Sequence, residues 1–191
     1  MYCNVYGSLI ERIYLDLDEV LVDFIGGAYS LLTGKNNTPT TKEYIDFIDK
    51  FDNDLEYGTW GRDKIRLAGS KWWRTLKKLP WADELLDASK CCGDVFLLTN
   101  PGIFSEAAQG KWEWASDNGF TGKIILASDK TCCASPSSVL IDDMKKNINP
   151  WIESGGIGLK LKREWSDKGI SPKDIIGILN SAKNCLKISQ K

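Results

Sequence analysis

Residues 14–24, which read YLDLDEVLVDF, place two aspartates two positions apart directly after an apolar run. The apolar run predicts a buried strand, so Asp16 and Asp18 would stand at its carboxyl end. Burying one unpaired carboxylate is unfavourable, and placing a second beside it is more so. We therefore expect either that water solvates this turn or that a cation binds there.

Polar residues close three further apolar runs of the chain. They are Thr99 with Asn100, Lys130, and Asp142 with Asp143. In an open parallel α/β sheet, ligands bind beyond the carboxyl ends of the strands, so all these groups would meet at one edge. Oxygen ligands without histidine or cysteine suit Mg²⁺, whereas a hydroxyl, a backbone amide and an ammonium group suit a phosphate. The sequence therefore predicts a combined magnesium and phosphate site.

Each element alone has an ordinary structural interpretation. An Asp-x-Asp pair at a strand end is most often a solvated turn, and Lys130 alone is typical of a surface lysine. Thr99 or the pair Asp142–Asp143 would serve equally well to cap the segment that follows. The prediction depends on finding four such elements in this order, each directly behind a buried-strand pattern.

Composition excludes several other kinds of chemistry. The 191 residues include no histidine, and the six cysteines show no C-x-x-C spacing, so we expect neither zinc nor histidine-dependent catalysis. The adjacent cysteines Cys91–Cys92 and Cys132–Cys133 are typical of reduced, buried thiols in a cytoplasmic protein. A net charge of -1 gives no support for nucleic acid or a membrane surface as a partner. No apolar run approaches the ~20 residues of a membrane span, and the first residues do not resemble a signal peptide.

Strand and helix patterns alternate along most of the chain. Helices are expected at 83–93 with Asp83 as N-cap, at 105–119, and from Ser171 as N-cap. This alternation predicts an α/β fold, a Rossmann-like open parallel sheet with helices on both faces. The strands are expected at 13–18, 95–100, 124–130, 139–143 and 156–161.

Residues 25–80 interrupt this alternation. Thr40 and Glu43 form a capping-box pattern, and short helices are expected at 61–69 and 70–79. Because no strand pattern occurs here, we predict a small helical cap domain at 25–80, inserted after the first strand. Residues 1–24 and 81–191 would then form the core domain.

The order D-x-D, Thr, Lys, D-D resembles the four motifs of the haloacid dehalogenase (HAD) superfamily. The stretches DLDEVLVDF, VFLLTNP, KWEWASDNG, IILASDKT and LIDD further resemble the 5'(3')-deoxyribonucleotidases. Together these motifs span roughly residues 13–143. The resemblance implies a HAD-like core that uses Mg²⁺ to hydrolyse a small-molecule phosphate monoester, a (deoxy)nucleoside monophosphate, through an aspartyl-phosphate. Two positions that border the phosphate differ from the usual pattern: Glu19 stands in place of glycine, and Asn100 in place of serine.

The resemblance also implies a role for each motif residue. Asp16 would be the nucleophile, and Asp18 the general acid that later acts as the base. Phosphate would be held by Thr99, the amide of Asn100 and Lys130, and the metal by Asp16, the backbone carbonyl of Asp18, Asp142 and Asp143.

Aromatic residues of the cap have two interpretations. Most of them, including Phe47 and Phe51, are expected to form the small core of the cap. Phe24 matches the aromatic residue that follows the first motif in the nucleotidases, so it is expected to bind the substrate by stacking on a nucleobase. Trp60, Trp72 and Trp73 are further candidates for this stacking surface.

Several alternative functions stay open at this point. A HAD phosphatase for another small phosphate ester or for a polynucleotide end is the nearest, although the only compact basic run, 71–78, is more typical of a solvated helix face. A haloacid dehalogenase proper needs no acid at the position of Asp18. A receiver-like signalling module or a catalytically silent phosphate- or metal-binding module belongs to a different class. The oligomeric state is left open, a dimer included.

Overall fold

Five parallel strands form the central sheet of this computed structural model, which describes residues 3–5, 8–35, 39–163 and 168–188. The order across the sheet is β5-β4-β3-β6-β7, so β3 lies in the middle. All five predicted strands are present, although β5 ends earlier than expected. Their bounds are β3 Arg12–Leu15, β4 Asp94–Thr99, β5 Ile124–Leu126, β6 Ser138–Asp142 and β7 Ile157–Lys160.

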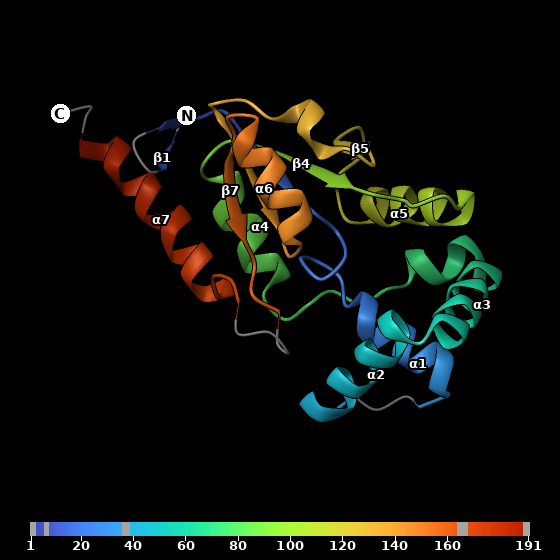
Figure 1. Cartoon of the computed structure of the whole chain (residues 1–191). Coiled ribbons are helices and arrows are strands. Elements are labelled where there is room, and N and C mark those ends of the chain that lie inside the picture. The colour runs from blue at the N-terminus through green and yellow to red at the C-terminus, as the bar shows by residue number, and fades with distance from the viewer. Residues whose placement is uncertain (1–2, 6–7, 36–38, 164–167, 189–191) are drawn as a thin grey trace.

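Helices cover both faces of this sheet, as Figure 1 shows. Side chains of successive strand residues point to opposite faces, so Ile13 and Leu15 pack in one core cluster and Tyr14 in another. The larger cluster lies against α4 and α7, and the smaller one lies against α6 through Ile148 and Trp151. The bounds are α4 Ala82–Lys90, α5 Ser105–Asp117, α6 Lys145–Glu153 and α7 Pro172–Ile188.

The N-cap residue that the sequence predicted is present at the start of α7 but not at the start of α4. The hydroxyl of Ser171 accepts a hydrogen bond from the backbone amide of Asp174 at 3.1 Å, so the predicted N-cap of α7 is confirmed. The prediction that Asp83 caps α4 is wrong, because the helix begins at Ala82 and Asp83 lies within its first turn. An acid there still interacts favourably with the helix dipole.

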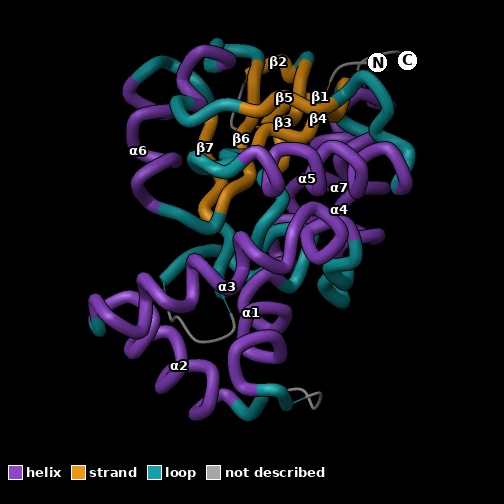
Figure 2. Tube along the Cα trace, turned by 90° about the vertical axis from the view of Figure 1, so that its right-hand side faces the viewer, coloured by secondary structure: helices purple, strands orange, loops and turns teal. Residues whose placement is uncertain are grey.

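Four helices lie between β3 and β4 in the chain, and Figure 2 shows the first three of them below the sheet. We call α1 (Phe24–Thr33), α2 (Thr41–Asn53) and α3 (Leu55–Arg74) the inserted helices. The capping box of Thr40 and Glu43 is present at the start of α2. Gly69 has φ 71° and ψ -176°, which kinks α3 and explains why the sequence indicated two short helices here.

The last turn of α3 and the segment after it pack closely against α5 of the core. Gly110 of α5 faces the backbone carbonyl of Ser70, where any Cβ would collide with it. The indole of Trp114 donates a hydrogen bond to the carbonyl of Leu76 at 3.1 Å, and Arg74 pairs with Asp117 at 2.7 Å. The inserted helices are therefore fixed to the core at one end.

The remaining described segments add little to the site. An antiparallel hairpin of β1 (Cys3–Val5) and β2 (Ser8–Ile10), which the sequence did not indicate, precedes β3. Cys92 is buried as predicted, but Cys132 is exposed, which corrects that expectation. Among the described residues, no helix combines the length and apolar character needed to cross a membrane.

Candidate active site

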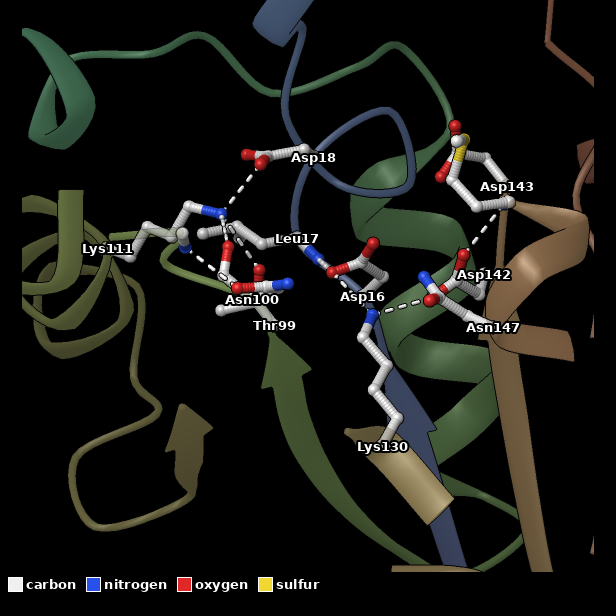
Figure 3. Close-up of polar contacts among 12 residues, drawn as sticks. Asp16, Leu17, Asp18, Thr99, Asn100, Lys111, Lys130, Asp142, Asp143 and Asn147 are labelled. Carbon is white, nitrogen blue, oxygen red and sulfur yellow. Dashed lines mark hydrogen bonds and ion pairs between the residues drawn. The ribbon is translucent and has the colours of Figure 1, made fainter. Parts of the chain in front are cut away.

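The carboxyl ends of the three central strands bring the predicted residues together, as Figure 3 shows. Asp16 follows β3 directly, Thr99 is the last residue of β4, and Asp142 is the last residue of β6. The parallel register pairs Leu15 with Ile141, so the next residues, Asp16 and Asp142, lie beside each other. The strand ends therefore meet at one edge, as the sequence predicted.

Lys130 joins the first and last motifs. Its ammonium group lies 2.9 Å from Asp16 Oδ1 and 2.6 Å from Asp142 Oδ2, and the residue is 3% exposed. Burial alone would lower the pKa of Lys130, but the adjacent carboxylates outweigh burial and raise it. Lys130 does not stand at the end of a strand as expected: it begins the short 3-10 helix Lys130–Cys133, after β5 has ended at Leu126.

Three buried carboxylates form a compact cluster. Asp16, Asp142 and Asp143 each offer an oxygen, and these oxygens lie within 4.8 Å of one another. Burial raises the pKa of Asp142 against the opposing effect of Lys130, and burial raises the pKa of Asp143 to about 7. Since burial disfavours the ionised acids, a divalent cation at this point would offset a large electrostatic penalty.

Both acids after β6 are held in place by neighbouring groups. Asp142 accepts hydrogen bonds from the Met144 amide at 2.7 Å and the Asn147 side chain at 2.9 Å. Asp143 pairs with Arg163, which comes from the segment after β7. The sequence interpretation did not include Arg163, because no spacing links residue 163 to the motifs.

Asp18 lies on the other side of Asp16 and has a lysine partner of its own. Lys111 Nζ of α5 lies 2.6 Å from Asp18 Oδ2, 3.0 Å from the Thr99 hydroxyl and 2.8 Å from the Asn100 carbonyl. Burial raises the pKa of Asp18, Lys111 lowers it and Asp16 raises it. The other oxygen, Asp18 Oδ1, is buried without a hydrogen-bond partner among the described residues. Such an environment favours a carboxyl group that can carry a proton.

Lys111 is a second residue of this site, besides Arg163, that the sequence interpretation did not include. It is 1% exposed, and it shares the buried side of α5 with Ala107, Trp114 and Ala115. Helical spacing places residues 107, 111, 114 and 115 on one face, so a lysine interrupts an otherwise apolar stripe. A long cation in an apolar stripe is a signal of a buried ion pair, and the sequence contained it.

We expect Lys111→Met to lower turnover of a phosphate ester by ~10²-fold or more, because Asp18, Thr99 and Asn100 lose a shared partner. Removal of the cation should raise the pKa of Asp18 further, so that a smaller fraction of Asp18 is ionised and able to take a proton from water. The variant should therefore accumulate phosphoenzyme, measured by rapid acid quench. Lys123→Met is the matched control, because Lys123 is exposed and its ammonium group contacts Asp94 at 3.7 Å and the Phe96 ring, away from the site. Equal turnover by Lys111→Met and wild type would remove Lys111 from the site.

The turn after Asp18 carries two further acids. Glu19 is 7% exposed with φ 57°, and its Oε1 accepts a hydrogen bond from the Ile25 amide at 2.7 Å. Asp23 is the N-cap of α1 and accepts from the Gly26 amide at 2.7 Å. Burial raises the pKa of Glu19 to about 8. Both acids therefore bind the first turn of α1, next to the predicted nucleophile.

A cavity of about 300 Å³ opens at this edge, between the core and the inserted helices. Its apolar wall comes from Phe24 and Ile25 of α1 and from Ile48 and Phe51 of α2. Phe24 thus lies where substrate binding was predicted, with its ring stacked on Trp73 at 5.3 Å between centroids. Phe47 and Phe51 both pack among the inserted helices, as expected, with their ring centroids 5.8 Å apart, and Phe51 also lines the cavity.

The tryptophan candidates lie elsewhere. Trp60 packs on Tyr57 and is 40% exposed, and Trp72 lines a separate cavity of about 490 Å³ that also contacts Gly26, Gly27 and Lys77. Trp73 is 8% exposed. Its ring stacks on Phe24, and the Lys111 ammonium group lies 5.1 Å from the ring centroid. In the described part of the chain, none of these three indoles lines the cavity at the strand ends.

Known structures with the same architecture are hydrolases. The chain is similar to a haloacid dehalogenase-like family hydrolase from Xanthomonas campestris, with a TM-score of 0.58 and 12% identity over 99% of this chain and 100% of that one. It is similar to a HAD hydrolase from Bacillus subtilis bound to magnesium, with a TM-score of 0.56 and 16% identity over 90% and 99% of the two chains. It is also similar to a defluorinating L-2-haloacid dehalogenase, with a TM-score of 0.58 and 12% identity over 96% and 100%. A scan against protein-family models finds no match, and a search of curated proteins finds no significant relative.

These similarities establish the fold. The chain has the fold of the HAD hydrolases, an α/β core with a parallel five-stranded sheet between helices, and the predicted fold class is confirmed. The finer resemblance to the deoxyribonucleotidases stays a prediction, because sequence identities of 12% to 16% carry no information about substrate.

Proposed function

We propose that this chain is a Mg²⁺-dependent phosphomonoesterase that hydrolyses nucleoside monophosphates through an aspartyl-phosphate on Asp16. The observation that carries the proposal is the arrangement of two buried lysines, each paired with carboxylates, around one edge of the sheet. Lys130 bridges Asp16 and Asp142, and Lys111 holds Asp18 against Thr99. A phosphoryl group between these lysines would meet a nucleophile on one side and a proton donor on the other.

The first step would transfer the phosphoryl group to the enzyme. A carboxylate oxygen of Asp16 forms a bond to phosphorus, and the bond from phosphorus to the ester oxygen breaks. Asp18 gives its proton to the departing alkoxide, for which its raised pKa suits it. Lys130 and the Thr99 hydroxyl stabilise the charge on the phosphoryl oxygens.

The second step would release phosphate. Asp18, now ionised and paired with Lys111, takes a proton from water as the water oxygen attacks phosphorus. The bond between phosphorus and Asp16 breaks, which restores both carboxyl groups to their starting states. One residue acts first as acid and then as base, so Asp18 must change protonation in every cycle.

The residues present fit a magnesium ion. Asp16, Asp142 and Asp143 supply hard oxygen ligands, and the backbone carbonyl of Asp18 is the further candidate. Mg²⁺ bound there would supply charge neutralisation for the phosphoryl group and hold its oxygens in line for attack. The HAD hydrolase from Bacillus subtilis is described as bound to magnesium, which supports the same assignment here.

We expect excess chelator to abolish turnover and added Mg²⁺ to restore it. Ca²⁺ should inhibit, because its longer and less regular coordination disfavours in-line attack. Asp142→Asn should weaken Mg²⁺ binding, measured by calorimetry without substrate, whereas Glu153→Gln on the exposed end of α6 should not. Full activity in excess chelator would contradict the metal assignment.

The apolar wall of the cavity supports a nucleoside monophosphate as substrate. Phe24 and Phe51 offer aromatic faces, which bind nucleobases without base-edge contacts. A panel of deoxy- and ribonucleoside 5'- and 3'-monophosphates, assayed for released phosphate with Mg²⁺, tests the assignment. Phe24→Leu should raise KM for nucleotides more than for p-nitrophenyl phosphate. A panel without any turnover, beside good turnover of other small phosphate esters, would reject the nucleotide assignment and keep the phosphatase.

Dehalogenation is the second candidate, because one similar structure is an L-2-haloacid dehalogenase. A halide leaves as a stable anion and needs no proton, so the lysine-paired Asp18 would have no purpose in releasing it. We therefore expect no halide release from L-2-haloacids. Halide release by the purified chain would favour this candidate over the phosphatase.

A further inference from the structure

Glu19 occupies an unfavourable position that the proposed mechanism does not explain. It has φ 57°, in the left-handed region, which is strained for a residue other than glycine. Its side chain is also 93% buried, which is unfavourable for a carboxyl group. Strained backbone of this kind is typical of functional sites, where surrounding structure holds it in place.

The hydrogen bonds of Glu19 satisfy only one side of its carboxyl group. Oε1 accepts from the Ile25 amide, and the described residues supply no hydrogen bond for Oε2. Within the described part of the chain, the buried side-chain polar atoms without a partner are Asp18 Oδ1 and Trp151 Nε1, so Glu19 Oε2 is not sealed in the interior. Because Glu19 lines the cavity of about 300 Å³, Oε2 opens into it.

Charges around the cavity leave Glu19 without a cationic partner of its own. Lys111 pairs with Asp18, Lys130 with Asp16 and Asp142, and Arg163 with Asp143. Lys146 also lines the cavity, and neither Lys146 nor Glu19 forms an ion pair with any described residue. Asp52 of α2 adds another acid to the lining of the same cavity. A positively charged donor in the substrate would supply the missing partner.

We propose that Glu19 is a specificity-determining residue, which selects phosphate monoesters whose alcohol carries an ammonium or amino group that donates to Oε2. The inference rests on the proposed phosphomonoesterase activity and adds to it the chemistry of the leaving alcohol. A charge-assisted hydrogen bond inside a cavity contributes about 1.5–3 kcal/mol. An ester with the amino group should therefore be preferred about 10- to 100-fold over an apolar ester of the same shape.

The test compares two esters of almost equal shape, 2-aminoethyl phosphate and propyl phosphate, with p-nitrophenyl phosphate as a reference. The measured quantity is the ratio of kcat/KM for the amino ester to kcat/KM for the propyl ester. For the wild type we expect a ratio of about 10 or more, because only the amino ester can donate a charged hydrogen bond to Glu19. Glu19→Gln should lower the ratio at least about fivefold, and Glu19→Gly should bring it close to unity.

Asp23→Asn is the matched structural control. Asp23 also accepts a backbone N–H from the first turn of α1, but it lines the other cavity. If Glu19 served only to hold α1, Glu19→Gln and Asp23→Asn would each lower kcat/KM for the two esters equally. The ratio of the two kcat/KM values would then stay unchanged. Thermal unfolding of Glu19→Gln, which keeps an oxygen to accept from Ile25, checks that the variant folds.

Each outcome bears on one inference. A wild-type ratio near unity, or an unchanged ratio in Glu19→Gln and Glu19→Gly, overturns the role of Glu19 while the phosphatase stands. Absence of turnover for all three esters and for the nucleotide panel overturns the phosphatase instead. A high wild-type ratio that falls in both Glu19 variants, but not in Asp23→Asn, establishes the selection.

Discussion

Asp16→Asn is expected to lower turnover of a phosphate ester by at least about 10⁴-fold while the chain folds normally. The amide keeps the shape of the side chain and can still accept a hydrogen bond from the Leu17 amide, seen at 2.8 Å. It cannot attack phosphorus as an anion, and it loses the charge that pairs with Lys130. Steady-state phosphate release and far-ultraviolet circular dichroism measure the two halves of this prediction.

Trapping experiments identify the nucleophile directly. Beryllofluoride with Mg²⁺ should place a phosphate mimic on Asp16, and a brief reaction followed by peptide mapping should place the phosphoryl group there. Asp94→Asn is a suitable control, because Asp94 is exposed at the opposite end of β4. Substantial turnover by purified Asp16→Asn would exclude the aspartyl-phosphate mechanism.

Asp18→Asn should lose about 10²–10⁴-fold in turnover of alkyl phosphates, because asparagine neither delivers a proton to the leaving oxygen nor takes one from water. The deficit in the first step should shrink with p-nitrophenyl phosphate, whose leaving group needs no proton. Pre-steady-state measurement of nitrophenol and phosphate release separates the steps. A burst of nitrophenol followed by slow phosphate release is expected.

The pH dependence gives a second readout of Asp18. Burial raises its pKa, so the protonated acid persists to a higher pH than for an exposed aspartate. The rate of enzyme phosphorylation by an alkyl ester should therefore fall as pH rises through this raised pKa. Asp18→Asn should lack that falling limb. Wild-type rates in both steps would remove Asp18 from proton transfer.

The sheet and its edge could be predicted from sequence because their signals are local. An apolar run of four to six residues followed by a polar side chain defines both a buried strand and the group at its end. Asp16, Thr99 and Asp142 were therefore found with their strands. Lys130 was found through the motif, although it lies in a short 3-10 helix beyond β5.

The groups that hold these residues were not predictable in the same way. Arg163 meets Asp143 across 20 positions, and Lys111 meets Asp18 across 93. The apolar stripe of α5 marks Lys111 as buried, but the group that it meets depends on how the helices pack, which spacing within one element does not encode. The break at Gly69, by contrast, was indicated by the sequence as the boundary between two short helices.

The central place of β3 in the sheet has a consequence for how such a site persists as sequences diverge. The three central strands β4, β3 and β6 are neighbours, so backbone hydrogen bonding spaces their ends at about 4.8 Å intervals whatever side chains fill the core. The relative positions of Asp16, Thr99 and Asp142 are thus inherited from the main chain. Mutations in the core can accumulate without moving these groups, provided the strands still pair. A catalytic geometry specified by the backbone is compatible with 12% to 16% identity between chains that share one architecture.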